Sequence, residues 1–205
     1  MKSLSTPPII IMGVQGSGKS TIGALLAKRL GVPFIDGDSL HPAANKEAMA
    51  SGHPLSDAER LPWLHEVGER LARGSGSGIV VACSALKRSY RDLLREHAPA
   101  MMTVFARGDL DLISSRVTAR RHEYMPPSLL GTQVDDLEER QPDEAGVTVN
   151  IADSPPAIID QIITAITRTA LSRPTNRSRP ERRLPDPRAV PGCRTPVDYR
   201  PPNTG

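Results

Sequence analysis

The eight residues GVQGSGKS, from Gly13 to Ser20, match the pattern G-x-x-x-x-G-K-[ST] at every fixed position. Glycines let the backbone curl so that successive N–H groups point inward, and the N-terminus of a following helix adds partial positive charge. In such a loop Lys19 reaches the terminal phosphates of a nucleotide, and the Ser20 hydroxyl is a ligand for Mg²⁺. The residues expected to bind the nucleotide here are Gly13, Val14, Gln15, Gly16, Ser17, Gly18, Lys19, Ser20 and Thr21.

Two carboxylates, Asp36 and Asp38, come directly after an apolar run that ends in FI. Side chains two residues apart in an extended segment point to the same side, so both can face one site. We predict that Asp36 helps Ser20 to hold Mg²⁺, and that Asp38 orients the attacking hydroxyl of an acceptor and takes its proton. The alternative is a pair of solvated turn residues, because aspartate is common in turns. The phosphate loop just upstream favours the catalytic interpretation.

Arginines gather in the segment SSRVTARRHEYMPPSLLGTQ, which a pair of prolines interrupts. Arg116 and Arg120 are four residues apart and share a face if the segment is helical. We expect a lid over about 116–131 that closes on the nucleotide, with both arginines on the phosphates and Arg120 also acting on the charge of the transferred group. The alternative is a solvated basic helix end, which the helix dipole favours.

The elements that must position these residues alternate between strand and helix. Short apolar or β-branched runs predict strands, and 3.6-residue periodicity predicts the helices between them. Such alternation indicates an α/β fold with a five-stranded parallel sheet and helices on both faces, whose ligands lie at the carboxyl ends of the strands. The phosphate loop fits this context, because it follows a strand and opens a helix. The expected strands are 8–13, 32–36, 78–84, 101–106 and 146–151, and the expected helices are 19–31, 57–73, 86–97, 109–121 and 155–170.

The chain lacks an NKxD-type guanine-reading run and has no second domain for a motor to move, which favours a small kinase. Three further segments, DGDSLHP, GHPLSDAERLPWL and CSALKRSYRDLLR, together with RHEYMPPSLLGTQVDDLEE, resemble the gluconokinase family of P-loop sugar-acid kinases over roughly residues 8–168. The resemblance implies a nucleoside-kinase-like fold, a dimer, and transfer of phosphate from Mg²⁺-ATP to the 6-hydroxyl of D-gluconate.

A sugar acid needs cations for its carboxylate and hydrogen-bonding groups for its hydroxyls. The resemblance to shikimate kinases favours Arg60 as the carboxylate clamp, and Pro62 is expected to break or restart the helix beside it. The alternative for each cation is a surface ion pair. The residues expected to contact the acceptor are Asp36, Asp38, His41, Arg60, Lys87 and Arg91.

Other enzymes of the same fold remain open as alternatives. Shikimate kinases usually carry Gly-Gly-Gly where this chain has CSALK, and adenylylsulfate kinases usually continue their Asp-Gly-Asp with Asn-Val-Arg rather than SLHP. Cys83 and Ser84 follow a strand, but the sequence shows no His–Asp set to activate either as a nucleophile. The histidines show no metal-ligand spacing.

The composition indicates the compartment, the domain bounds and the class of partner. No apolar run is long enough to span a membrane, and two isolated cysteines suit the reducing cytoplasm. We expect a kinase domain over 1–171 and a disordered tail over 172–205, which holds eight prolines and eight arginines. The tail raises the alternative of a nucleotide-gated nucleic-acid binder. Because no aromatic ladder accompanies the arginines, we do not expect nucleic acid to be a partner.

Overall fold

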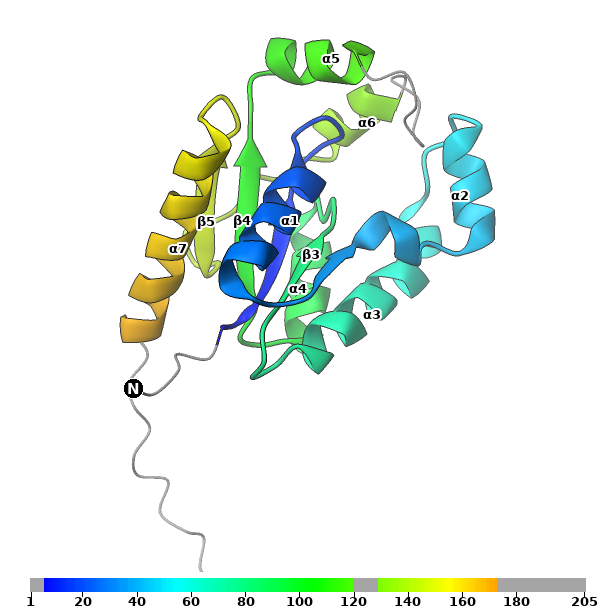
Figure 1. Ribbon diagram of the computed structural model, residues 1–205. Coiled ribbons are helices and arrows are strands. Elements are labelled where there is room, and N and C mark those ends of the chain that lie inside the picture. Colours follow the sequence, from blue (N-terminus) through cyan, green and yellow to red (C-terminus); the bar gives the residue numbers. More distant parts are fainter. Residues whose placement is uncertain (1–5, 120–128, 173–205) are drawn as a thin grey trace, which may run out of the picture. The chain divides into compact units, whose positions relative to one another are not determined.

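The computed structural model describes residues 6–119 and 129–172. The chain divides into two units, Met1–Arg173 and Pro174–Gly205, and the described residues belong to the first. Strands and helices alternate along it (Figure 1). The elements are β1 (Pro8–Met12), α1 (Lys19–Leu30), β2 (Phe34–Asp36), the 3₁₀ helix η1 (Gly37–Leu40), α2 (Ala43–Ala50), α3 (Asp57–Arg73), β3 (Ile79–Ala82), α4 (Arg88–His97), β4 (Met102–Arg107), α5 (Leu110–Ala119), α6 (Leu130–Asp135), β5 (Gly146–Asn150) and α7 (Pro155–Ser172).

The five strands form one parallel sheet in the order β2-β3-β1-β4-β5. Because β1 lies in the centre, the loop after it opens at the middle of the sheet's carboxyl edge. The loop after β2 opens at the same edge, two strands away. The order of the strands therefore brings the phosphate loop and the two aspartates to one end of the sheet, where parallel α/β folds bind their ligands.

Alternate residues of β1 face opposite sides of the sheet, and each side has its own core. Ile9 and Ile11 pack with the apolar side chains of α1, α5 and α7, whereas Ile10 and Met12 pack with those of α3 and α4. All four side chains are fully buried. Figure 1 shows the same arrangement, with α1 and α7 on one face and α3 and α4 on the other. The long apolar run of β1 is what a strand covered on both faces requires.

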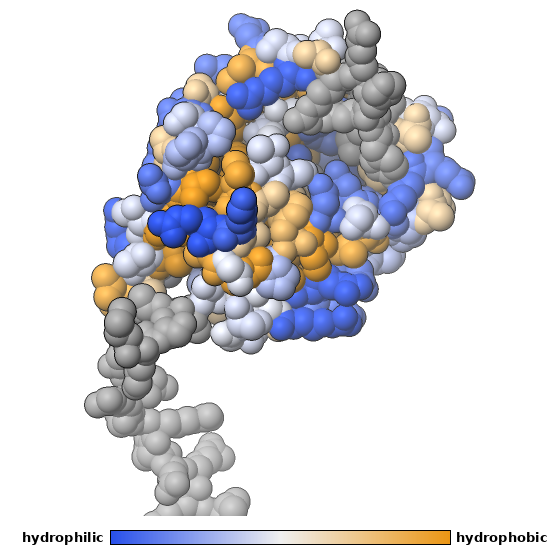
Figure 2. Space-filling view, in the orientation of Figure 1, coloured by the Kyte–Doolittle hydropathy of each residue, from blue (hydrophilic) through white to orange (hydrophobic). Residues whose placement is uncertain are grey.

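Apolar side chains also reach the surface between α1 and α7. Leu25 is 40% exposed there and lines a shallow groove with Pro155 and Pro156. The face seen in Figure 2 shows hydrophobic and hydrophilic residues interspersed. Among the described residues, no helix is both long and apolar enough to cross a membrane.

The predicted fold class is confirmed, with each predicted strand and helix in place to within a few residues. The sequence reading missed α2, η1 and α6, which are short. The expectation that Pro62 breaks the helix was wrong, because α3 continues through it. A proline removes one helical hydrogen bond. A Ser56–Glu59 capping box and the buried face that includes Trp63 and Leu64 hold α3 together.

Candidate functional site

The phosphate loop between β1 and α1 requires glycine at particular positions. Gly13 has φ 148°, and a Cβ there would lie 2.7 Å from the Ser17 hydroxyl and 2.9 Å from the Ala106 carbonyl. Gly18 has φ 84° and precedes α1, and because it carries no side chain it cannot cap the first turn of the helix itself. The first turn of α1 therefore presents its backbone N–H groups and its positive dipole end to the site, which suits a phosphate group.

Three side chains of the loop and of β2 suit a Mg²⁺-nucleotide. Lys19 Nζ donates to the Val14 carbonyl at 3.1 Å, which folds the ammonium over the loop. Ser20 Oγ donates to Asp36 Oδ2 at 2.7 Å. This places a hydroxyl and a carboxylate side by side at the first turn of α1, and Mg²⁺ prefers such oxygen donors. The residues present therefore fit the ion that the motif implies.

Asp36 fixes the turn that carries Asp38. Its Oδ1 accepts the backbone N–H of Asp38 at 3.1 Å, and its carbonyl accepts the Ser39 hydroxyl at 2.6 Å. The turn also packs tightly, because the Gly37 carbonyl accepts the Trp63 indole N–H at 2.7 Å. Asp38 thus leaves a braced turn, and its carboxylate lines the pocket next to the loop.

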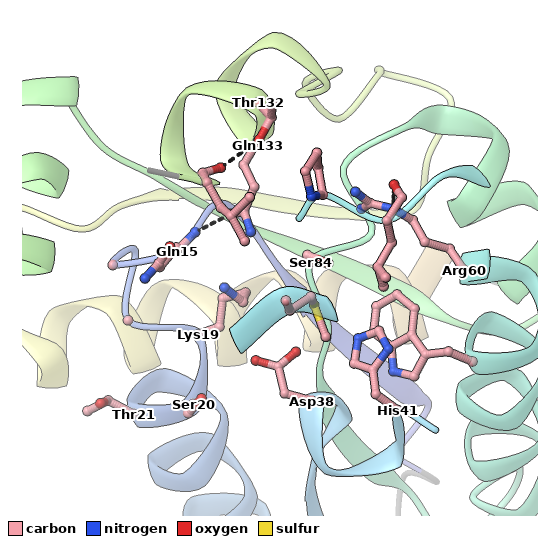
Figure 3. Close-up of a pocket in the computed structure, with 17 residues that line it drawn as sticks. Gln15, Lys19, Ser20, Thr21, Asp38, His41, Arg60, Ser84, Thr132 and Gln133 are labelled. Carbon is pink, nitrogen blue, oxygen red and sulfur yellow. Dashed lines mark hydrogen bonds between the residues drawn. The ribbon is translucent and has the colours of Figure 1, made fainter. Parts of the chain in front are cut away.

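One pocket joins these groups. In Figure 3, Lys19 and Asp38 point into it from the side of the phosphate loop, while Arg60 enters from another side. The stacked rings of His41 and Trp63 lie beside them, with centroids 4.1 Å apart. The lining residues are Gln15, Gly16, Gly18, Lys19, Ser20, Thr21, Asp38, His41, Met49, Pro54, Leu55, Arg60, Trp63, Ser84, Leu129, Thr132 and Gln133.

His41 is a neutral member of this pocket. Its side chain is 7% exposed, and its Nδ1 makes no hydrogen bond within the described residues. Burial, followed by the charges of Arg60 and Lys46, lowers the pKa of His41 to about 4. At neutral pH its ring therefore offers one donor and one acceptor, which suits a hydroxyl better than a carboxylate.

This pKa predicts how stability depends on pH. The unfolded chain protonates His41 below about 6.5, whereas the folded protein keeps it neutral down to about 4. The unfolded state then binds more protons, so the contribution of His41 to stability falls as pH falls from 6.5 to 4 and is constant above that window. We expect the unfolding free energy of the wild type, minus that of His41→Gln, to slope only in this window. A difference that also changes between pH 7 and 8 would contradict the assignment.

Three arginine or lysine side chains were predicted to contact the acceptor, and Arg60, which lies on α3, does line the pocket. Its Nε donates to the Leu55 carbonyl at 3.1 Å, which holds the side chain against the start of α3. The guanidinium lies over the Tyr90 ring, 5.9 Å from its centroid. Arg60 is therefore placed as a carboxylate-binding group.

Lys87 and Arg91 were predicted to contact the acceptor, but the structure brings neither into the pocket. The Lys87 ammonium is bonded to Asp57 at 2.8 Å. Arg91 is fully buried, and its guanidinium pairs with buried Glu144 at 2.7 and 3.0 Å. Arg91 also donates to four backbone carbonyls, those of Ala85, Leu86, Glu138 and Glu139. Arg91 therefore joins α4 to the segment that contains Glu138, Glu139 and Glu144, and its guanidinium is buried away from the pocket.

Arg91→Met should destabilise the protein strongly, because it leaves Glu144 charged and buried without its main partner. We expect the free energy of unfolding to fall by about 3–5 kcal/mol in urea titrations. Adding Glu144→Leu should recover part of the loss. The matched control is Arg88→Met, which removes a partly exposed cation of the same helix and should change stability by less than about 1 kcal/mol. Equal stability of Arg91→Met and the wild type would contradict the structural role.

The arginines of the predicted lid are described only in part. Arg116 lies at the end of α5, where Nη2 donates to the Ile151 carbonyl at 3.0 Å. Its Nη1 lies 4.0 Å from where a Cβ on Gly18 would be, so the guanidinium is close to the phosphate loop. Arg120 lies outside the described residues, as does most of the segment 116–131. Its role stays a prediction.

Cys83 at the end of β3 is fully buried, and burial raises the pKa of its thiol to about 12, with a further contribution from Asp38. A thiol in this state is not a nucleophile. The neighbouring Ser84 lines the pocket.

Sequence reasoning missed one wall of the pocket. Met49, Leu55 and Leu129 form a small separate core that joins α2 to the start of α6. Gln133 of α6 accepts the backbone N–H of Gln15 at 2.6 Å, which ties the phosphate loop to this helix (Figure 3). These contacts join segments that are far apart in the chain, so no local sequence pattern predicts them.

The chain is similar in sequence to known kinases. A family model described as Shikimate kinase matches residues 15–167. The thermoresistant gluconokinase of Escherichia coli K12 is 43% identical over 149 residues, which cover 71% of this chain and 85% of that protein.

Solved structures of kinases also resemble this chain. A gluconokinase from Sinorhizobium meliloti superposes with a TM-score of 0.74 at 43% identity, covering 82% of this chain and 95% of that one. The Mycobacterium tuberculosis APS kinase CysC, at 17% identity and a TM-score of 0.58, covers 80% of this chain and 98% of that one and shares the fold alone. The match to the shikimate kinase model identifies the wider group of kinases that share this fold, and the identities above 40% identify the family within that group. The chain belongs to the gluconokinase family of P-loop kinases.

Proposed function

We propose that this kinase transfers the γ-phosphate of ATP to the 6-hydroxyl of D-gluconate. The observation that carries the proposal is one pocket that holds Lys19 and Asp38 beside the phosphate loop and Arg60 on a different side. Gluconate has its carboxylate and its 6-hydroxyl at opposite ends of a six-carbon chain. The pocket therefore offers a cation for one end and a carboxylate base for the other.

In-line transfer needs little covalent chemistry from the protein, so position and charge do most of the work. Lys19 and the N–H groups of the loop hold the phosphates, and Arg116 lies near enough to add charge. Asp38 orients the 6-hydroxyl and accepts its proton as the oxygen attacks. Ser20 and Asp36 would hold Mg²⁺, which neutralises phosphate charge when bound. Neutral His41 would bind a hydroxyl of the acceptor.

The lid over 116–131, the action of Arg120 on the transferred group, and the homodimer are further parts of the proposal. The family resemblance supports the dimer. The Arg116 position near Gly18 supports a lid that closes on the nucleotide side. Shikimate and adenylylsulfate remain the alternative acceptors for this fold, and relatives above 40% identity favour gluconate over both.

The test is ADP release from Mg²⁺-ATP with a panel of acceptors: D-gluconate, shikimate, adenylylsulfate, and D-glucose, which lacks the carboxylate. We expect release well above background with D-gluconate only. Arg60→Met should raise KM for D-gluconate and leave KM for ATP near that of the wild type. Preference for another acceptor, or release that ignores all four, would contradict the proposed acceptor.

A further inference from the structure

Arg60 enters the pocket with its guanidinium only loosely held by a protein carboxylate. Its side chain is 13% exposed, and its Nη2 lies 3.8 Å from Asp136 Oδ2. This distance is longer than a direct hydrogen bond. Asp136 therefore attracts the guanidinium without occupying its donors. Arginine binds carboxylates best through two parallel N–H···O bonds, and Arg60 keeps donors for such a contact with a ligand.

Asp136 follows α6 and is shared between two cations. While its Oδ2 faces Arg60, its Oδ1 lies 3.5 Å from the Lys87 ammonium. The next charge in the chain of contacts is Asp57, which Lys87 approaches at 2.8 and 3.2 Å. Anions and cations thus alternate across three helices.

The far end of this chain is fixed. Tyr90 donates its hydroxyl to Asp57 Oδ1 at 2.5 Å. Hydrogen bonds from Lys87 and then Tyr90 hold the pKa of Asp57 below its usual value, so its carboxylate stays charged near neutral pH. Asp57 anchors Lys87 at a set distance from Asp136. Lys87 is therefore a fixed charge rather than a free surface lysine.

We propose that Lys87 is a positioning residue for Arg60: it draws Asp136 toward itself and so keeps Asp136 from closing onto the guanidinium that binds the substrate carboxylate. The inference rests on the proposed role of Arg60. Asp136 is an internal carboxylate that competes with the substrate for the same donors. When Lys87 is removed, Asp136 loses one of its two cations, and Arg60 becomes its only close counter-charge among the described residues. The competitor then occupies the substrate's place.

This predicts an unusual pattern in mutant kinetics. Lys87→Met should raise KM for D-gluconate about tenfold, with kcat and KM for ATP within about twofold of the wild type. Adding Asp136→Asn should restore most of the lost affinity, because the amide competes poorly for the guanidinium. The same Asp136→Asn change in the wild-type background should have a much smaller effect, so the double-mutant cycle is non-additive. Lys87→Arg, which keeps the charge, should stay close to the wild type.

The matched control is Arg88→Met, which removes the cation next in sequence. Arg88 pairs with Asp92 and Asp143, away from the pocket, so KM for D-gluconate should not change. A direct contact between Lys87 and the substrate gives the opposite result for the double variant, whose KM would stay as high as that of Lys87→Met. Such additivity would overturn the inference.

A second readout does not depend on the acceptor. A crystal structure of Lys87→Met should show the Asp136 carboxylate in direct hydrogen bonds with Arg60, at about 2.8 Å. An Asp136–Arg60 separation unchanged from 3.8 Å would overturn the inference, whatever the enzyme phosphorylates. Failure of the wild type to use D-gluconate would instead overturn the proposed acceptor alone.

Discussion

Lys19→Met is expected to lower kcat by at least about 10²–10³-fold while the domain stays folded. The Lys19 ammonium lies over the phosphate loop, bonded to the Val14 carbonyl at 3.1 Å, where it can meet the charge that develops on the transferred phosphate. Methionine is unbranched, only one atom shorter than lysine and similar in helix propensity, so α1 should form as before. Steady-state kinetics and circular dichroism measure both parts.

Lys28→Met is the matched control, because Lys28 lies in the last turn of the same helix and points to solvent. Its turnover should equal that of the wild type. A folded Lys19→Met protein with near wild-type kcat would show that the loop does not act on the transferred phosphate.

Asp38→Asn is expected to reduce kcat by about 10²–10⁴-fold, the range for a positioned general base. The amide is nearly isosteric, but it cannot accept the hydroxyl proton. Because Asp36, and not Asp38, pairs with Ser20 at the start of α1, KM for ATP should change little. Kinetics with ATP and acceptor varied in turn separate the two effects.

Two further variants serve as comparisons for Asp38→Asn. Asp36→Asn should instead raise the Mg²⁺ concentration needed for half-maximal activity, because it weakens an oxygen donor beside Ser20. Asp160→Asn, at an exposed position of α7, should change neither parameter. If Asp38→Asn altered ATP binding and left kcat intact, Asp38 could not be the base.

The strands and the phosphate loop could be predicted because their signals are local. A β-branched run such as that of β1 can be buried only in a sheet covered on both faces, and GVQGSGKS leaves the backbone little choice. Asp38 could also be placed, because a strand end and a glycine fix its position. Because all five strands are parallel, the loop after β1 and the turn after β2 lie at the same edge of the sheet.

The cations could not be sorted from the sequence, because their roles depend on long-range partners. Arg60 and Arg91 each lie in a predicted helix that comes after a predicted strand. In the structure, however, Arg60 lines the pocket and Arg91 is fully buried. The difference is Glu144, which lies more than fifty residues from Arg91 and comes beside it only in the fold. Lys87 likewise meets Asp136 only after α6 is in place.

The most direct test is ³¹P NMR of the product formed from Mg²⁺-ATP and D-gluconate. A phosphate on the 6-hydroxyl is bonded through oxygen to a CH₂ group, so its signal should split into a triplet in the proton-coupled spectrum. The account predicts this triplet in the wild type, and the same triplet growing about 10²–10⁴-fold more slowly in Asp38→Asn. A doublet, which marks a phosphate on a secondary hydroxyl, or inorganic phosphate alone would contradict transfer to the 6-hydroxyl.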